Sequence, residues 1–164
     1  MMVQTIVFII LSLVTLGAAI AVVTTKNLFH SALFLILSFV GVAGFYILLE
    51  APFLAAVQIL VYVGAIAVLI VFAIMLTRRL MAKDLVQRNA QWGWSTLGAG
   101  LLFAVLGFVL VRVNWPVVEA AVPEETITIL GRELMGTYVL PFEVASILLL
   151  VALVGSIIIA REKE

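Results

Sequence analysis

The chain has 164 residues, of which 66% are hydrophobic and only 11% are charged, and its formal net charge is zero. A typical soluble domain is about 45–50% apolar and about 25% charged, and a chain of this size has too much surface to hide so many apolar side chains from water. The composition therefore excludes a water-soluble fold. The zero net charge also argues against a nucleic-acid partner, because no basic field is present to attract phosphates.

The residue types also limit the redox chemistry that this chain can support. The sequence contains no cysteine and a single histidine. Disulfides, iron–sulfur clusters and thiolate metal sites are therefore excluded on this chain, and so is the usual pair of histidine haem ligands. We expect a membrane protein without a redox cofactor of its own.

Five apolar stretches are long enough to cross a bilayer as helices, because about 30 Å of hydrocarbon requires ~20 residues. Alternation of polar and apolar residues with period two, the signature of membrane strands, is missing. The sequence therefore predicts an all-α integral membrane protein with one membrane domain and five transmembrane helices. The predicted spans are 3–25, 28–49, 53–77, 92–112 and 138–160.

The basic residues predict the orientation of the chain. Only Arg112 and Arg132 lie on the side that follows the second and fourth spans, and the other basic residues lie on the opposite side. The positive-inside rule then places the N-terminus outside and the C-terminus in the cytoplasm. Nothing basic precedes Lys26, so we expect the first span to be a retained helix and not a cleaved signal peptide.

The longest predicted extramembrane segment is the external loop 114–136. Within it, residues 126–130 alternate threonine with isoleucine and end in leucine. This short pattern fits a strand and an interfacial turn equally well, so the sequence leaves both interpretations open.

The third span carries polar and small residues in its apolar run. Gln58 and Tyr62 are four residues apart, so they lie on one face of a helix. Gly64 lies near the middle of the span, where it permits close helix approach and weakens the helix. One interpretation is a packing face whose tyrosine bonds to a neighbour. The other is a helix built to bend or rotate, because π-helical irregularities cluster at functional sites.

Two carboxylates lie close to the predicted membrane boundary. Glu50 precedes Pro52 at the external end of the second span, as either an exposed interfacial group or a protonatable end of a buried polar path. About 17 apolar residues follow Glu143, which places this residue near or slightly below the external interface. A simpler role for Glu143 is to cap the last helix, because the helix dipole favours a carboxylate there.

Small residues at spacings of three and four predict contact faces between helices. These residues are Gly41 and Gly44, then Gly100, Ala104 and Gly107, and finally Ala145, Ala152 and Ser156. The sequence has no phosphate-binding loop, dinucleotide fingerprint, nucleophile elbow or histidine-rich metal pattern. It offers no candidate catalytic, cofactor-binding or metal-binding residues.

Three segments carry a resemblance to a known family. Residues 61–76, which read VYVGAIAVLIVFAIML, resemble the third transmembrane helix of the J subunit of bacterial respiratory complex I, a proton-translocating NADH:quinone oxidoreductase. Residues 26–33 are similar to the first cytoplasmic turn of that family, and residues 141–152 are similar to the start of its last helix. Residues 80–136 show no recognisable signature of the family.

The resemblance implies a non-catalytic subunit in the membrane arm of the complex, in a bacterial plasma (inner) membrane. NADH, FMN, iron–sulfur clusters and quinone would then be bound by partner subunits. The implied neighbours are the quinone-site subunit, the antiporter-like subunits and the small K-type and A-type subunits, all within the lipid bilayer.

The resemblance also implies a conformational switch at Tyr62, Val63 and Gly64, where a π-bulge converts to regular α-helix and rotates the rest of the helix. That rotation would open or close a water path along the arm. Tyr62 would serve the switch, and Glu50 is an implied relay group. The other polar groups of this hypothetical proton path are Gln58 and Glu143.

Two alternatives remain open. The chain could be the corresponding subunit of a related ion-pumping assembly: a ferredoxin:plastoquinone oxidoreductase, a membrane-bound hydrogenase or a multisubunit antiporter. It could also be a free-standing small transporter or scaffold. The second alternative is disfavoured, because five spans do not divide into the two structural repeats that transporters commonly contain.

Overall fold

The computed structural model describes residues 2–77, 91–114 and 125–161, and in this part of the chain all regular secondary structure is helical. The helices in chain order are α1 (Met2–Thr24), α2 (Leu28–Leu48), α3 (Pro52–Val57), η1 (Gln58–Ala67), α4 (Val68–Leu76), α5 (Trp92–Arg112), α6 (Thr126–Met135) and α7 (Val139–Ala160). Because α3, η1 and α4 follow one another without a break, they form a single helix of 25 residues.

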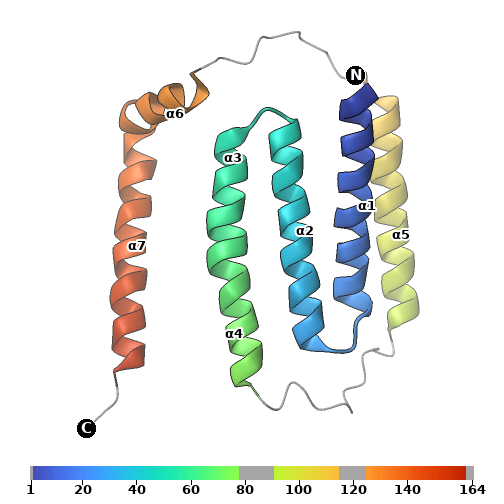
Figure 1. The fold of residues 1–164 in the computed structure, drawn as a ribbon, viewed down its shortest axis with the longest axis horizontal. Coiled ribbons are helices and arrows are strands. Elements are labelled where there is room, and N and C mark those ends of the chain that lie inside the picture. The colour runs from blue at the N-terminus through green and yellow to red at the C-terminus, as the bar shows by residue number, and fades with distance from the viewer. Residues whose placement is uncertain (1, 78–90, 115–124, 162–164) are drawn as a thin grey trace. The chain divides into compact units, whose positions relative to one another are not determined.

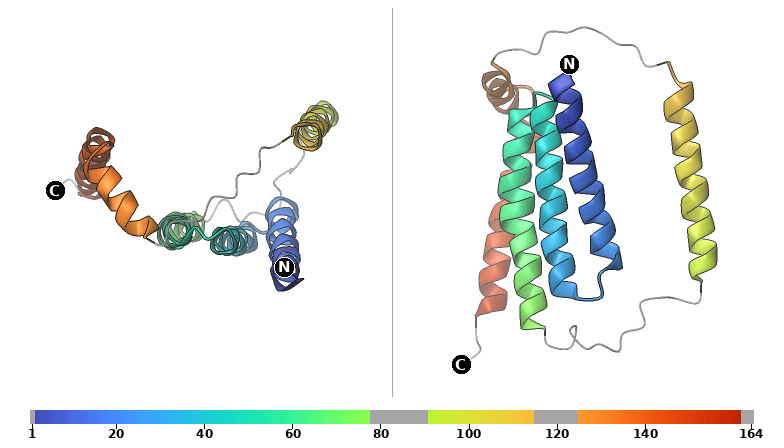
Figure 2. Two further views of the ribbon diagram at one scale, coloured as in Figure 1. Left: turned by 90° about the horizontal axis from the view of Figure 1, so that it is seen from above. Right: turned by 45° about the vertical axis from the view of Figure 1, so that its right-hand side comes forward.

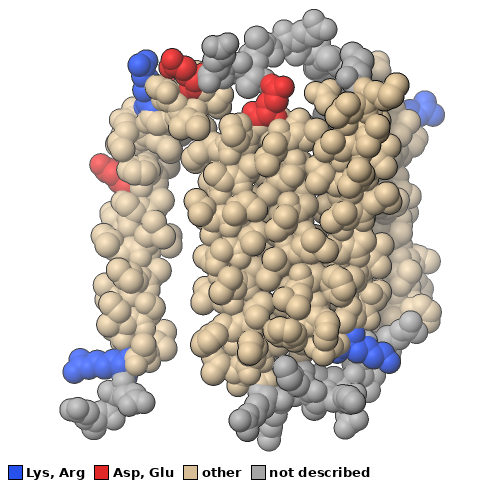
Figure 3. Space-filling model, in the orientation of Figure 1, with Lys and Arg blue, Asp and Glu red and all other residues tan. Residues whose placement is uncertain are grey.

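The predicted all-α fold with five candidate membrane spans is confirmed for the described residues. Within the described ranges, five helices are long and apolar enough to cross a membrane: α1, α2, the continuous α3–η1–α4 helix, α5 and α7. On the face drawn in Figure 3, most charged side chains lie near the ends of the helices, while the long middle part consists of other residues. This distribution suits a protein whose middle lies in hydrocarbon.

The first two helices form an antiparallel hairpin (Figure 1). Helix α2 begins at Leu28 because the side chain of Asn27 accepts a hydrogen bond of 2.9 Å from the Phe29 N–H. Near this turn, Ser31 Oγ donates to the Val22 carbonyl at 2.5 Å. At the far end of the hairpin, the rings of Phe8 and Phe45 meet edge to face, with centroids 5.6 Å apart.

Glycines allow α1 and α2 to approach each other closely. A Cβ added to Gly41 would collide with Thr15 Oγ1, and one added to Gly44 would lie 2.7 Å from Leu11 Cδ2. The predicted contact face at Gly41 and Gly44 is therefore confirmed. By contrast, Gly100 and Gly107 have open space where a Cβ would stand.

We expect Gly41→Leu to disrupt the α1–α2 hairpin. The new side chain must displace Thr15, whose backbone Cα is only 3.4 Å from the added Cβ, and overpacking of this kind costs about 1–3 kcal/mol or more. The expected result is a lower Tm of the purified protein and less of the chain retained in membranes. Gly17→Leu on α1 is the matched control, because nothing lies within 4 Å of its Cβ position. Equal stability of the two variants would contradict this packing role.

Helices α1, α2 and α3–η1–α4 stand side by side, with α2 between the other two (Figures 1 and 2). The residues buried between them are mostly alanines, and no large side chain is fully buried in the described part of the chain. The buried alanines are Ala18, Ala32, Ala43, Ala55 and Ala67. The large apolar side chains are exposed instead, as they would be in a chain that is surrounded by lipid or by other protein.

The described residues 125–161 belong to a second compact unit. Its first helix, α6, occupies the segment that the sequence left open between a strand and an interfacial turn, so neither interpretation was correct. Helix α6 lies across one end of α7 (Figure 2). The turn between the two helices is held by a hydrogen bond of 2.8 Å from the Tyr138 N–H to the Glu133 carbonyl.

Candidate functional site

The third span contains a π-helix, η1, which runs for ten residues from Gln58 to Ala67. Tyr62, Val63 and Gly64 all lie within it. Most π-helices are single-turn bulges inside α-helices, and they occur frequently at functional sites. A π-helix of this length in the middle of a membrane span is therefore the strongest candidate for a functional element in the described chain.

One aromatic residue of α2 contacts both polar residues of η1. The Gln58 Nε2 atom donates to the Phe39 carbonyl oxygen at 3.5 Å, which is a long hydrogen bond. The Tyr62 ring meets the Phe39 ring edge to face, with centroids 5.6 Å apart. Phe39 could not be singled out from the sequence, because one phenylalanine among ten in an apolar chain has no distinguishing signal.

Gln58 is the deepest polar side chain of this site. It is only 6% exposed, and it is the one buried polar or charged residue in the described ranges. Gln58 lies six residues after Pro52, which places it about 9 Å along the helix. A buried amide in this position needs its hydrogen bond, because an unpaired amide costs about 1–3 kcal/mol. The contact with Phe39 therefore ties the start of η1 to α2.

The π-helix changes which residues of the third span face its neighbours. A line of buried and half-buried residues runs along the span with spacings of three, five, four, four and three residues. In chain order these residues are Ala55, Gln58, Val63, Ala67, Val71 and Ile74. An α-helix turns about 100° per residue, so Ala67 would lie about half a turn away from Gln58 in an unbroken α-helix. The wider turns of η1 bring both residues to the same side.

A second line of residues is available for an α-helical form. Counting from Gln58 at 3.6 residues per turn, the residues on the same face would be Tyr62, Ala65, Leu69, Phe72 and Leu76. All five are exposed now, with Leu69 and Leu76 each 66% exposed. The third span therefore has two lines of mostly apolar residues. The π-helical backbone places the first line on the side of Gln58, and an unbroken α-helix would place the second line there.

Gly64 has a close contact that belongs to the π-helical backbone. A Cβ added to Gly64 would lie 3.3 Å from the carbonyl oxygen of Ile59, five residues earlier. A π-helix pairs residues five apart, whereas an α-helix pairs residues four apart. A side chain at this position would therefore crowd the carbonyl that lies at the π-helical spacing.

Glu50 has an unusual backbone conformation in the turn between α2 and α3. Its φ angle is 56°, the only positive φ of a non-glycine residue in the described ranges. The Glu50 N–H bonds to the Ile47 carbonyl at 3.1 Å, and the Ala51 N–H bonds to the Tyr46 carbonyl at 2.9 Å. This is a Schellman motif, in which the left-handed residue is usually glycine. A glutamate there costs about 1–2 kcal/mol, and such strain is concentrated at functional sites.

The structure brings only some of the predicted polar residues together. Gln58 and Tyr62 both contact Phe39, whereas Glu50 lies in the turn before α3, eight residues before Gln58. Glu143 belongs to the second unit. It is the fifth residue of α7, because that helix begins at Val139 with Tyr138 in the N-cap position. The interpretation of Glu143 as a helix cap was therefore wrong.

The described residues contain no group of three or more histidine, cysteine, aspartate or glutamate side chains that could hold a metal ion. What this part of the chain offers is a ten-residue π-helix in a membrane span, with Gln58 and Tyr62 on it and Phe39 of α2 beside it. This arrangement suits a conformational or proton-conducting role.

Comparison with known proteins gives consistent matches. The profile of one protein family, NADH-ubiquinone/plastoquinone oxidoreductase chain 6, matches residues 18–159. The NAD(P)H-quinone oxidoreductase chain 6 of Leptolyngbya boryana is 41% identical over 98% of this chain and 81% of its own length. The protein of the same name in Synechocystis is 42% identical over 97% of this chain and 81% of its own length. Subunit J of the F(420)H(2) dehydrogenase of Methanosarcina mazei is 42% identical over 96% of this chain and 91% of its own length.

Proposed function

Because the chain belongs to the family of NADH-ubiquinone/plastoquinone oxidoreductase chain 6, we propose that it is a non-catalytic membrane-arm subunit that couples quinone reduction to proton translocation. The observation that carries this proposal is the π-helix η1 with its two alternative apolar lines. Conversion of η1 to α-helix turns α4 by about half a turn. That rotation is large enough to exchange the side chains that line a water path.

The cofactors and partners of the chain follow from this role. NADH, FMN, iron–sulfur clusters and quinone are held by partner subunits, since this chain has no cysteine ligands to offer. The chain lies between the quinone-site subunit and the antiporter-like subunits, next to the small K-type and A-type subunits. Its N-terminus faces outward and its C-terminus faces the cytoplasm of a bacterial plasma membrane, as the basic residues favour.

The proton path in this proposal runs along the third span. Glu50 stands at its external end, just before Pro52. Counted from Pro52, Gln58 lies about 9 Å along the helix and Tyr62 no more than about 15 Å, near the bilayer centre. The gaps between these groups are filled by water when the helix is in one register and are closed in the other. Tyr62 changes its surroundings most, because it lies in the segment that converts. We also propose Glu143 of α7 as a polar group of the path.

Two pairs of introduced cysteines test the switch. Because this chain has no native cysteine, any cross-link within it must join the introduced pair. Ala32 and Ala67 are 4% and 1% exposed, and Ala32 lies on the same face of α2 as Phe39. In the assembled complex, Ala32→Cys with Ala67→Cys should be joined by a short reversible thiol cross-linker. Proton pumping should then stop, because the π-helical register is locked, and a reductant should restore it.

The matched control is Ala43→Cys with Ala55→Cys. These residues lie one turn from the Phe39–Gln58 contact, on the side of η1 that does not rotate. Their cross-link should leave pumping unchanged. Full pumping by the complex cross-linked at positions 32 and 67 would overturn the switch. Loss of pumping with both cross-links would show that the two helices must separate, and it would contradict a rotation.

A second candidate keeps the same membrane role in a complex with a different electron donor. The observation that favours it is the relative from Methanosarcina mazei, which is named for an F(420)H(2) dehydrogenase and is as similar as the chain 6 relatives. Purification of the complex through a tag on this chain, followed by identification of its subunits, tests both candidates. A partner that accepts electrons from NADH supports the first, and one that accepts them from another donor supports the second.

A further inference from the structure

Helix α6 is too short to cross a membrane, unlike the five candidate spans. It has ten residues and lies across the end of α7, which spans 22 residues of high hydropathy (Figures 1 and 2). A helix that lies across the end of a membrane span lies at the level where hydrocarbon gives way to water. The two helices meet at Tyr138, an aromatic residue of the kind enriched at this level.

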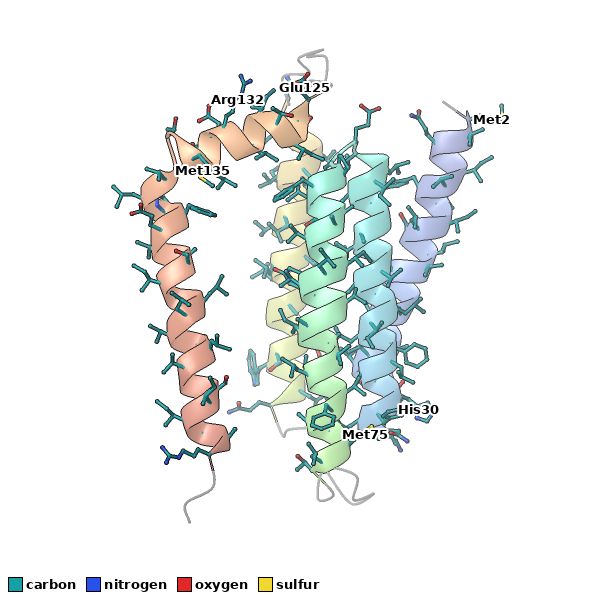
Figure 4. All side chains as sticks on the ribbon, turned by 60° about the vertical axis from the view of Figure 1, so that its left-hand side comes forward. Met2, His30, Met75, Glu125, Arg132 and Met135 are labelled. Carbon is teal, nitrogen blue, oxygen red and sulfur yellow. The ribbon has the colours of Figure 1, made fainter. Side chains whose placement is uncertain are left out.

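The two sides of α6 differ in polarity. Arg132 points away from α7 (Figure 4). Leu130 and Leu134 are each two residues from Arg132 and therefore about 200° around the helix from it, and Ile127 is about 140° away. We call Ile127, Leu130 and Leu134 the apolar face of α6. Ile129 and Met135 are each three residues from Arg132, so they lie about 60° from it, on the same side of the helix.

This chain covers the apolar face only in part. Leu130 and Leu134 are half-buried, but Ile127 remains 63% exposed. The face points toward the level of the α7 side chains, since Arg132 on the other side points away from α7. What lies at that level around a membrane span is the acyl-chain boundary of the lipid.

We propose that α6 is an interfacial anchor that lies in the plane of the membrane, with its apolar face inserted between phospholipid acyl chains and Arg132 at the level of the phosphates. An amphipathic helix of this kind typically inserts its apolar face about 5–10 Å into the boundary. Arg132 can then bond to a phosphate through its planar guanidinium. The partner of α6 is the phospholipid of the leaflet at this end of α7.

The anchor also sets the depth of Glu143. This residue lies four positions after Val139, the first residue of α7, and so about 6 Å further into the membrane. A carboxylate at that depth is stable only with water or a polar partner beside it. If α6 lies at the interface, the start of α7 is held at that level, and Glu143 then lies about one helical turn below the head groups.

Cysteine accessibility in membranes of the assembled complex tests the anchor. We choose Ile127→Cys for the apolar face, because this chain leaves that position exposed, and Arg132→Cys as the matched position on the other side. Open membrane fragments, in which both membrane surfaces are accessible, are treated with a polymer that carries a maleimide group. Reaction with the cysteine increases the apparent mass of this chain, and the rate of that increase is measured. We expect Arg132→Cys to react and Ile127→Cys to react more slowly by a factor on the order of ten.

Removal of the lipid separates the possible outcomes. In delipidated detergent complex that retains all its subunits, Ile127→Cys should react about as fast as Arg132→Cys if lipid alone covered it. Continued protection there would mean that a partner subunit covers the face, which overturns the proposal. Equal reaction of both positions in the original membranes would also overturn it. Loss of pumping has no bearing on these outcomes, so they are independent of the switch in η1.

Discussion

Replacing Gly64 by valine is expected to lower proton translocation by about tenfold or more, while electron transfer from the donor to an artificial acceptor stays unchanged. The added Cβ would lie 3.3 Å from the Ile59 carbonyl, so it crowds the π-helical backbone. Removal of glycine also favours the α-helix, by up to about 1 kcal/mol when alanine replaces it. A bias of only about 1.4 kcal/mol changes the ratio of two conformations tenfold.

Gly64→Ala separates the two causes of this bias. Alanine adds the same Cβ and has the higher helix propensity, whereas valine has the lower propensity and adds a stiff branch that crowds the π-helical backbone further. A larger shift in Gly64→Val than in Gly64→Ala would therefore assign the effect to crowding, and the reverse order would assign it to helix propensity. The measurement is proton pumping per electron in closed vesicles, with cross-linking of the pair at positions 32 and 67 as the structural readout. Both variants should cross-link less than the parent chain, because position 67 turns away from α2.

Gly100→Val in α5 controls for the general effect of a branched residue in a membrane helix. Its Cβ position has nothing within 4 Å, so no neighbour must move. We expect normal pumping in this variant. A Gly64→Val complex that pumps normally and cross-links normally would contradict the role of Gly64, and poor assembly of Gly64→Val but not of Gly100→Val would indicate a packing role instead.

The number and limits of the spans could be predicted from the sequence because they depend on composition alone. A run of about 20 apolar residues can satisfy its backbone hydrogen bonds in hydrocarbon only as a helix, so the five spans needed no knowledge of their neighbours. The α6 segment is different. Its ten residues are too few for a clear helical period, and threonine and isoleucine at 126–129 favour strands. The helix forms there although local propensity points elsewhere.

The candidate site shows a second limit. Gly64 and Tyr62 stand out in an apolar run, so the position of the irregular helix could be inferred from composition and family resemblance. The partner of Gln58 could not, because a backbone carbonyl of Phe39 looks like every other carbonyl in the sequence. The backbone of Glu50 was also hidden. A left-handed residue after a helix is usually glycine, and a glutamate at that position gives no sequence signal of the turn.

Removing the charge of Glu50 should lower proton pumping by about a hundredfold, the effect typical of losing a positioned proton-transfer group, and yet it should stabilise the turn. The matched pair is Glu50→Asp and Glu50→Asn, which differ from each other only in the protonatable oxygen. Aspartate and asparagine both tolerate the left-handed conformation better than glutamate, so both variants should relieve part of the strain at φ 56°. A higher Tm of the complex in both variants is the expected structural result.

Proton pumping distinguishes the two variants, because both are expected to stabilise the turn to a similar extent. Glu50→Asp keeps a carboxylate at the external end of the proposed path and should retain most of the pumping, whereas Glu50→Asn should lose it. Glu50→Gly removes the side chain and the strain together, and so it should combine the highest Tm with the same loss of pumping. If Glu50→Asn pumped as well as Glu50→Asp, the carboxylate would have no role in proton transfer. The left-handed glutamate would then destabilise the turn without contributing to function. Both hydrogen bonds of the turn come from the backbone N–H groups of residues 50 and 51, so glycine at position 50 would keep them.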